Sequence, residues 1–210
     1  MPSAKHGKRR YESAKRARAA ARTRQRIIDA AHGLLERDDG NVLALQEIAV
    51  AAGVSRATIY KTIGSRRELL AAVFEDQGRL INYQRVRDAQ QHPDPYHAVI
   101  STVRNAAQAW SEIPGPIRKV LALAVLDPEI GELVSKYERY RREEVAALAL
   151  RAHGAGVFGA SITLRNATST LVLLTGFATF DALQSDVGPA AAIEQLARIA
   201  RSGLAMAVIE

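Results

Sequence analysis

The chain has 210 residues, of which 48% are hydrophobic and 24% charged, a balance typical of a globular protein with one large domain or two small ones. The aromatic fraction is only 5%, which favours helices packed through small residues over a β-sandwich. There is no cysteine, so disulfides, thiolate nucleophiles and cysteine-based metal sites are excluded. Because we find neither a secretory signal nor an apolar run of about 20 residues, we expect a cytoplasmic protein that does not enter a membrane.

The positive charge is concentrated at one end of the chain. Residues 1–70 hold 15 Lys or Arg against 7 Asp or Glu, a net of +8, whereas residues 71–210 hold 14 against 15, a net of −1. Within the first 26 residues, ten basic side chains face a single acid, Glu12. Such a run is either a solvated tail or a surface for a polyanion, so nucleic acid is one candidate partner.

Apolar residues recur at helical spacing after this basic segment. The spacing predicts a helix from about residue 22 to the turn at residues 38–41. That turn reads Asp-Asp-Gly-Asn, but it lacks the alternating oxygen ligands and the final Glu of a calcium loop, so we interpret it as a helix end. The apolar residues of this helix are Ile27, Ile28, Ala31, Leu34 and Leu35.

Residues 45–63 have the pattern of two short helices around a tight turn. Ala49 is small enough to let the helices cross closely, Gly53 can adopt the positive φ of the turn, and Ser55 can cap the second helix. The sequence therefore predicts a helix-turn-helix, a motif that places its second helix in the major groove of DNA. The other residues assigned to the motif are Val54 and Ile59 between the helices, and Arg56, Thr58, Tyr60, Lys61 and Thr62 on the outward face of the second helix.

The stretch from Arg26 to Phe74 resembles the DNA-binding domain of the tetracycline-repressor (TetR) family. Gly64 ends the second helix of the motif, and Ser65 with Glu68 forms a capping box that starts the next. The resemblance covers about 50 residues. It rests on the order and spacing of Ala30-Ala31, Gly40, Ile48-Ala49, Ala52-Gly53-Val54-Ser55, Ile59-Tyr60, Ser65 and Leu69-Leu70.

This resemblance implies an all-α fold, with an N-terminal three-helix DNA-binding domain that contains the helix-turn-helix and a C-terminal helical domain for ligand binding and dimerisation. We divide the chain accordingly into a basic, flexible arm at residues 1–21, the DNA-binding domain at residues 22–70 and the helical domain at residues 71–210.

Three residues depart from the family pattern. Ala44 stands where the family usually has a Thr that caps the first helix of the motif and contacts phosphate, so one phosphate contact is in doubt. Ile63 replaces Phe and Arg66 replaces Lys, and these two changes keep the apolar and basic character.

Roles for the DNA-binding side chains follow from their places in the motif. Arg56 lies where the recognition helix approaches base edges, and guanine is its natural bidentate partner. Tyr60, Lys61 and Arg66 match the family's phosphate-contacting positions, and Thr58 can reach a phosphate or a thymine methyl group. The candidate DNA-binding residues are Gln46, Ser55, Arg56, Thr58, Tyr60, Lys61, Thr62 and Arg66.

The rest of the chain has an all-helical pattern. Asp94-Pro95 and Asp127-Pro128 each combine an N-cap residue with proline at the first helical position. They predict helices at residues 95–113 and 128–152. Further helices are expected at residues 116–126, 161–183 and 189–208.

Residues 154–159 match the dinucleotide fingerprint G-x-G-x-x-G, and Asp181 lies at about the distance expected of its ribose-binding acid. The fingerprint requires a preceding strand, whereas a charged helical stretch precedes it here, so we interpret it as a flexible helix–helix connection. No His pair has metal-binding spacing and no nucleophile elbow is present. We therefore expect no metal, no cofactor and no enzymatic activity.

The last two helices carry stripes of small and apolar residues. The stripes predict a dimer interface of the kind that the resemblance implies, and the alternative is that they face the protein's own core. They comprise Leu164, Thr168, Leu171, Thr175 and Ala178, and Ile193, Leu196, Ala197, Ala200 and Leu204.

A small-molecule pocket is expected among the helices of residues 95–183, because large apolar side chains with a few polar anchors are the usual lining of such pockets. Each candidate could also be ordinary core or surface. Arg104 and Asp181 carry the sharper expectation, since a charge turned toward an apolar interior needs a partner. The candidate ligand-binding residues are Arg104, Asn105, Trp110, Asn166, Phe177, Phe180 and Asp181.

Two functions fit these observations. We expect a TetR-like transcriptional repressor that binds a palindromic double-stranded DNA operator as a homodimer and is released by a small, largely apolar effector. The alternative is a helical, nucleoid-type protein that binds DNA nonspecifically through its basic tail and takes no ligand. The helix-turn-helix favours the regulator, because a purely electrostatic binder has no use for a capped recognition helix.

Overall fold

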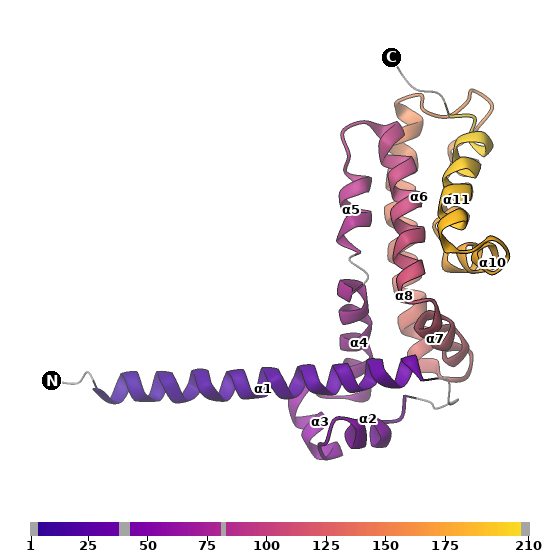
Figure 1. The fold of residues 1–210 in the computed structure, drawn as a ribbon. Helices are drawn as coiled ribbons and strands as arrows, with labels where there is room; N and C mark the ends of the chain where they lie inside the picture. Colours follow the sequence, from indigo (N-terminus) through magenta and orange to yellow (C-terminus); the bar gives the residue numbers. More distant parts are fainter. Residues whose placement is uncertain (1–3, 38–42, 81–82, 207–210) are drawn as a thin grey trace. The chain divides into compact units, whose positions relative to one another are not determined.

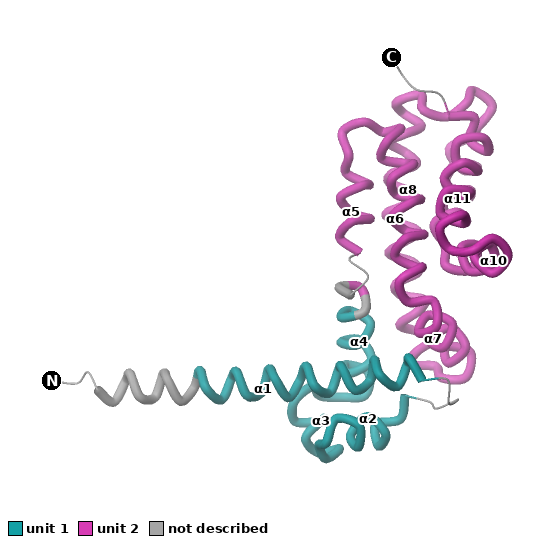
Figure 2. The backbone as a smooth tube through the Cα atoms, viewed as in Figure 1, with its two compact units in different colours: residues 1–76 teal, residues 77–210 magenta. Residues whose placement is uncertain are grey.

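All regular secondary structure in the described part of the chain is α-helical, as the sequence predicts (Figure 1). The chain separates into two compact units, Met1–Asp76 and Gln77–Glu210, and the division falls within one helix (Figure 2). The computed structural model describes residues 4–37, 43–80 and 83–206, and the side chains of residues 14–37, 43–76, 78 and 83–206. The turn expected at residues 38–41 lies outside these ranges, apart from the end of the preceding helix at Glu36.

The first unit is built around one apolar stripe of its long first helix. The predicted stripe residues, from Ile27 to Leu35, are at most 4% exposed, and their helix contacts both helices of the helix-turn-helix. The helices of the unit are α1 (Ala4–Glu36), α2 (Leu45–Ala51), α3 (Arg56–Thr62) and most of α4 (Arg66–Leu80). The largest fully buried side chains are Ile27, Ile28, Leu35, Leu43, Ile48, Ile59, Leu69 and Leu70.

Helix α1 begins at Ala4, well before residue 22, where the apolar pattern starts. Residues 4–21, which we expected to form a flexible arm, are helical in the structure. The segment has no proline after Pro2 and is rich in Ala, Arg and Lys, which have high helix propensity. Apolar periodicity marks where a helix packs, and a helix can begin well before that point.

The second unit is formed by α5 (Gln84–Gln90), α6 (Pro95–Glu112), α7 (Pro114–Leu126), α8 (Pro128–Gly154), α9 (Leu164–Leu174), α10 (Phe177–Val187) and α11 (Pro189–Gly203). Both predicted Asp-Pro starts are confirmed. The Asp94 carboxylate accepts from the Tyr96 amide over 2.8 Å, and the Asp127 carboxylate accepts from the Glu129 amide over 3.0 Å. Each aspartate thus satisfies an amide that the first turn of its helix leaves without a partner.

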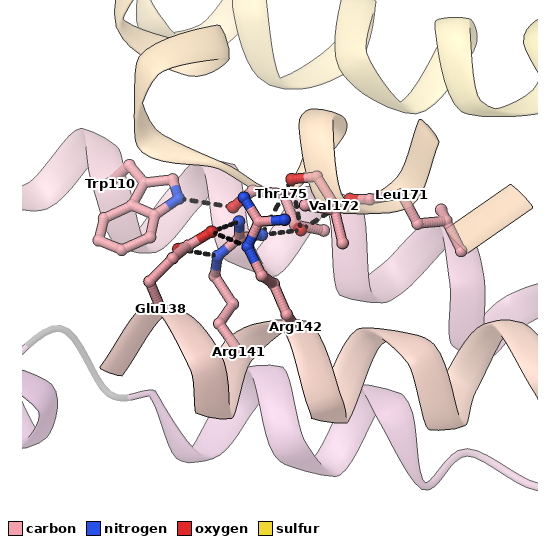
Figure 3. A network of polar contacts seen from close by, with 7 residues as sticks. All are labelled: Trp110, Glu138, Arg141, Arg142, Leu171, Val172 and Thr175. Atoms are coloured by element: carbon pink, nitrogen blue, oxygen red, sulfur yellow. Dashed lines mark hydrogen bonds and ion pairs between the residues drawn. The ribbon is translucent and has the colours of Figure 1, made fainter. Parts of the chain in front are cut away.

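The helix expected at residues 161–183 is instead two helices, α9 and α10, separated at Thr175 and Gly176. Polar groups take over the carbonyls at the end of α9: the Thr175 hydroxyl donates to the Leu171 carbonyl over 2.7 Å, and Arg141 of α8 donates to the Val172 carbonyl over 3.0 Å (Figure 3). The contact from Arg141 comes from another helix, so the apolar pattern of the segment could not reveal it. The short helix α5 was likewise missed, because seven residues carry little periodicity.

The core of the second unit lies where α6, α8, α9 and α11 meet, and α6 runs beside both α8 and α11 (Figure 1). Its largest fully buried side chain is Phe180. Across residues 4–37, 43–80 and 83–206, no helix combines the length and the apolar character that crossing a bilayer requires.

This core contains most of the residues predicted to form a dimer interface. Leu196, Ala197 and Ala200 of α11, and Leu204 directly after it, are at most 1% exposed in the single chain. Leu171 and Thr175 are also buried. For these six residues the single chain itself supplies the buried surroundings, because stripe periodicity identifies a buried face without saying what buries it. The remaining candidates, Leu164, Thr168, Ala178 and Ile193, are partly or fully exposed.

The glycine-rich segment at residues 154–159 connects α8 and α9, and no strand is found in the described ranges. This segment is packed more closely than a flexible connection would be. Val157 and Phe158 are buried in the core, and the Gly159 amide donates to the Leu204 carbonyl over 3.1 Å. The resemblance to a dinucleotide fingerprint therefore ends at the glycine spacing.

Candidate nucleic-acid interface

The turn between α2 and α3 is a Schellman motif centred on Gly53. The Gly53 amide donates to the Val50 carbonyl over 3.1 Å and the Val54 amide donates to the Ala49 carbonyl over 2.9 Å, which satisfies the last carbonyls of α2. Gly53 has a φ of +61°, a conformation that strains most other residues. The positive φ predicted at this glycine is confirmed.

Helix α3 begins at a side-chain cap and is anchored by one buried residue. Ser55 has extended backbone angles, and its Oγ accepts from the Thr58 amide over 3.1 Å, so the predicted cap is confirmed. Ile59 is fully buried. Because α3 has only seven residues, it is too short to be stable alone, and its orientation depends on the cap and on Ile59.

Outside its buried face, α3 carries exposed side chains that can bind a polyanion. Arg56 and Lys61 are exposed, neither has an ion-pair partner in the described part of the chain, and Tyr60 is 47% exposed. Arginine can bind guanine edges and lysine can bind phosphate. The other candidate DNA-binding residues lie in the same unit: Gln46 and Ser55 are exposed, and Thr58, Thr62 and Arg66 are half-buried.

The start of α2 lacks the cap that α3 has. Ala44 occupies the N-cap position with extended backbone angles and makes no side-chain hydrogen bond. Glu47 stands three residues later, where a glutamate completes a capping box, and its Oε2 atom is buried without a hydrogen-bond partner. The box thus lacks only a hydroxyl at residue 44.

Helix α4, which follows the motif, starts with a complete capping box. The Ser65 amide donates to Glu68 Oε2 over 2.6 Å, and the Glu68 amide donates to Ser65 Oγ over 3.2 Å. The hydrogen bond from the Ser65 backbone holds the pKa of Glu68 below its usual value. This box fixes where α4 begins and so positions its first residue, Arg66.

A polar contact between α1 and α4 was not predicted. His32 Nε2 lies 3.3 Å from the Asp76 carboxylate, and the two side chains are only 12% and 9% exposed. Gln25 Nε2 also reaches the Asp76 carboxylate, over 3.5 Å. The contact ties the helix that supports the motif to the helix that follows it, and no local sequence pattern links residues so far apart.

Comparison with known proteins agrees with this geometry. The family model for bacterial regulatory proteins of the tetR family matches residues 27–73, which begin at the buried stripe of α1 and end in α4. These residues therefore form a DNA-binding domain of the TetR family. The TetR-family domain contains the whole helix-turn-helix, so this motif is a DNA-binding one. No curated protein matches the chain by sequence.

Solved structures share the fold over nearly the whole chain. A TetR transcription regulator from Haloarcula marismortui is similar with a TM-score of 0.66 and 19% identity, covering 89% of this chain and 98% of that one. NalD of Pseudomonas aeruginosa, the secondary repressor of the MexAB-OprM multidrug efflux pump, is similar with a TM-score of 0.61 and 22% identity, covering 88% of this chain and 98% of that one. The fatty acid degradation regulator FadR of Bacillus halodurans is similar with a TM-score of 0.59 and 20% identity, covering 88% of this chain and 97% of that one. The similarity therefore includes the second unit, whose fold is that of a TetR-family transcriptional regulator.

The charged candidates for ligand binding already have partners. Arg104 pairs with Glu194 over 2.5 Å, and Asp181 pairs with Arg118 over 2.6 Å. Asp181 and the Nη2 atom of Arg104 are thus paired with opposite charges near the surface, whereas the Nε atom of Arg104 is buried without a hydrogen-bond partner. Of the remaining polar candidates, Asn105 donates to the Arg85 carbonyl and Asn166 is exposed.

Of the three aromatic candidates for ligand binding, only Trp110 lines a cavity. Trp110 lines a cavity of about 10 Å³, which has room for about one water molecule. Phe177 packs edge-on against Trp110 at a ring-centroid distance of 5.7 Å, and Phe180 is fully buried in the core. The cavity is lined by Tyr83, Val86, Gln90, Thr102, Ala106, Ala109, Trp110, Arg141, Val145 and Thr175.

Three residues of the cavity lining, Trp110, Arg141 and Thr175, belong to a polar network (Figure 3). Arg141 is only 12% exposed and donates to both carboxylate oxygens of Glu138, over 2.6 and 2.9 Å, and to the Thr175 hydroxyl over 2.6 Å. Trp110 Nε1 donates to the Thr175 carbonyl over 2.9 Å. Arg141 was not a predicted site residue, because it stands in a charged run that reads as a solvated helix face.

Proposed function

We propose that this protein is a transcriptional repressor that binds a palindromic operator as a homodimer and is released from it by a small, largely apolar effector. The observation that carries the proposal is the capped, exposed helix α3 behind its Schellman turn. A helix held in this way presents fixed side chains to base edges, which nonspecific binding does not require.

Within this proposal, the side chains on and around α3 have separate roles in binding DNA. Arg56, at the first position of α3, contacts a base edge in the major groove. Lys61, Tyr60 and Arg66 contact the phosphates that set the register of the helix. Gln46, Ser55, Thr58 and Thr62 complete the contact surface.

The dimer surface is proposed to lie on α8 and α9 rather than on α11. Leu173 of α9 is 64% exposed and Leu150 of α8 is 60% exposed, so both helices present a large apolar side chain to solvent. A shallow groove of about 520 Å³ lies beside Leu173, and its lining comes from α8 and α9. The lining residues are Arg142, Glu143, Ala146, Thr168, Ser169, Val172 and Leu173. Small residues along such a groove allow close packing of helices from a second copy.

The effector is proposed to enter the cavity beside Trp110. The Thr102 hydroxyl, on a residue only 1% exposed, lines the cavity without a hydrogen-bond partner, so a ligand could supply the partner that the group needs. Since the cavity is far smaller than a drug-sized pocket, binding requires the surrounding helices to move. That requirement suits an effector that favours one of two arrangements of the chain. A regulator of fatty acid degradation among the similar structures supports an apolar effector.

Recovery of genomic DNA fragments by the purified protein tests the proposal. Sequencing should give a few sharply enriched sites that share an inverted repeat, and footprinting should protect that repeat. The genes beside those sites would indicate the class of effector. Even coverage without a shared motif would instead support the nucleoid-type alternative, which the basic N-terminal segment would then explain.

A further inference from the structure

Residues 14–22 of α1, where the description of its side chains begins, have no packing partner that explains the helix. Every residue from Ala14 to Arg22 is exposed, and the apolar core of the first unit begins only at Ile27. Helices of this kind gain little from propensity alone, so a segment without buried contacts is marginal in water. Its sequence supplies charge instead of an apolar face.

Four cations form one stripe along this helix, which we call the basic stripe: Lys15, Arg18, Arg22 and Arg26. Their spacing of three, four and four residues places them on a single helix face, because residues three and four apart are neighbours on a helix. At about 100° per residue the stripe lies opposite the face of Ile27, Ala31 and Leu34, which are buried. All four stripe residues are exposed, so the stripe faces solvent along its whole length.

The basic stripe is not neutralised within the described part of the chain. None of the four residues has an ion-pair or hydrogen-bond partner there. The nearest acid on the same face, Asp29, accepts a hydrogen bond from Gln25 instead. Like charges at these spacings repel one another and destabilise an isolated helix. The arrangement is therefore unfavourable unless an anion is bound.

We propose that the basic stripe binds the phosphate backbone of duplex DNA, beyond the contacts that α3 makes. The eleven-residue separation of its ends corresponds to about 16 Å along the helix. That length matches roughly five base pairs at about 3.4 Å each. DNA is the favoured polyanion because the stripe belongs to the unit that carries the helix-turn-helix. A membrane surface fits poorly, since an interfacial helix needs an apolar face with large side chains and residues 14–22 contain only Ala, Lys and Arg.

The test compares a stripe variant with a charge-matched control. The stripe variant carries Lys15→Gln, Arg18→Gln and Arg22→Gln, and glutamine keeps the helix propensity of α1. The control carries Lys136→Gln, Arg139→Gln and Arg198→Gln, three exposed cations of the second unit. Affinity for a random-sequence duplex of about 40 base pairs, roughly four helical turns, is measured by fluorescence anisotropy from about 0.05 to 0.2 M KCl. Circular dichroism of both variants checks the helix content.

The stripe variant should bind the duplex more weakly. The slope of log K against log salt should be shallower by about 0.9 for each phosphate that is no longer neutralised, or about 2.7 per chain. The control should keep the wild-type slope. An unchanged slope in the stripe variant would overturn the proposal. The proposal would also be overturned if the stripe variant bound more weakly than wild type to vesicles of equal parts phosphatidylcholine and phosphatidylglycerol but kept the wild-type salt slope on DNA.

This inference stands apart from base reading by α3. An Arg56→Ala variant should lose site preference and keep the salt slope on the random-sequence duplex, whereas the stripe variant should keep its site preference. If the expected result for one of these two variants is not obtained, the proposal tested by the other variant still stands.

Discussion

Ser55 and Thr58 are joined twice at the start of α3: the Thr58 amide donates to Ser55 Oγ over 3.1 Å, and the two hydroxyl oxygens lie 2.9 Å apart. The first contact satisfies an amide that the helix leaves open, and the second orients the Thr58 side chain. The same pair therefore sets both where α3 begins and how one of its candidate DNA-binding side chains points.

Replacing Ser55 with Ala should lower the free energy of unfolding of the first unit by about 1 kcal/mol, the usual cost of losing an N-cap. DNA affinity should fall as well, because a frayed α3 presents its side chains less rigidly. Urea unfolding and DNA titration measure the two effects. Ser135→Ala, at an exposed position on α8, is the control and should change neither. A Ser55→Ala protein with wild-type stability would show that the cap is dispensable.

Replacing Ala44 with Ser should have the opposite effect and stabilise the first unit by about 1 kcal/mol, because the new hydroxyl completes a capping box with Glu47. Urea unfolding measures the gain. In a Glu47→Ala background the gain should shrink, since the reciprocal half of the box is then missing. An equal gain in both backgrounds would mean that Glu47 takes no part in the cap.

The sequence predicted the helix-turn-helix well because every signal in it is local. Gly53 needs a positive φ, Ser55 caps the helix that starts beside it, and Ile59 lies one turn further on. Each depends on residues within a few positions, so the pattern carries the geometry.

The second unit was predicted less well because its details depend on distant residues. Arg141 and Trp110 reach the end of α9 from other helices and help to break the expected long helix there. Leu196 and Ala200 have the spacing of an interface stripe, but they are buried in the core of the same chain, in which α11 packs against α6. Periodicity can identify a buried face, and only the fold identifies what lies against it.

Substitutions on α3 should separate base reading from phosphate binding. Arg56→Ala should cost about 1 to 3 kcal/mol on the cognate site and relax preference at one position. Lys61→Ala should weaken binding to all sequences and make the salt slope shallower by about 0.9. Titrations against the cognate site and a scrambled site measure both. If Arg56→Ala left the preference unchanged, α3 would have to read DNA through other side chains.

Glu138 should make the second unit sensitive to acid. Partial burial opposes ionisation of Glu138, but hydrogen bonds and charge from Arg141 and Arg142 outweigh it, so the pKa lies below its usual value of 4.5. The stabilisation is therefore fully present above pH 4.5 and is lost as the pH falls through the lower pKa of the folded state. Glu138→Gln should be less stable than wild type at pH 7, because Arg141 stays buried without its partner.

Unfolding of the wild type and Glu138→Gln across this pH range checks the prediction. The difference in unfolding free energy between them should shrink as the pH falls below 4.5. A difference that stays constant with pH would show that the carboxylate charge contributes nothing.

Leu173→Glu should weaken the proposed dimer while leaving the single chain folded, because Leu173 is 64% exposed and surface changes usually alter stability by about 0.5 kcal/mol or less. Sedimentation velocity at micromolar concentration should show a shift toward monomer. Val125→Glu, at an apolar position 83% exposed on α7, is the matched control and should remain dimeric. A wild-type protein that sediments as a monomer would contradict the dimer itself.

Selection of DNA from a randomised duplex library by the full chain tests whether α3 reads DNA sequence. We expect enrichment of one motif made of two inverted half-sites, with centres about one helical turn or a whole number of turns apart. The Arg56→Ala protein should enrich a motif that is degenerate at one position of each half-site. A library that stays random after repeated rounds, while the protein still binds DNA at low salt, would contradict sequence-specific reading by α3.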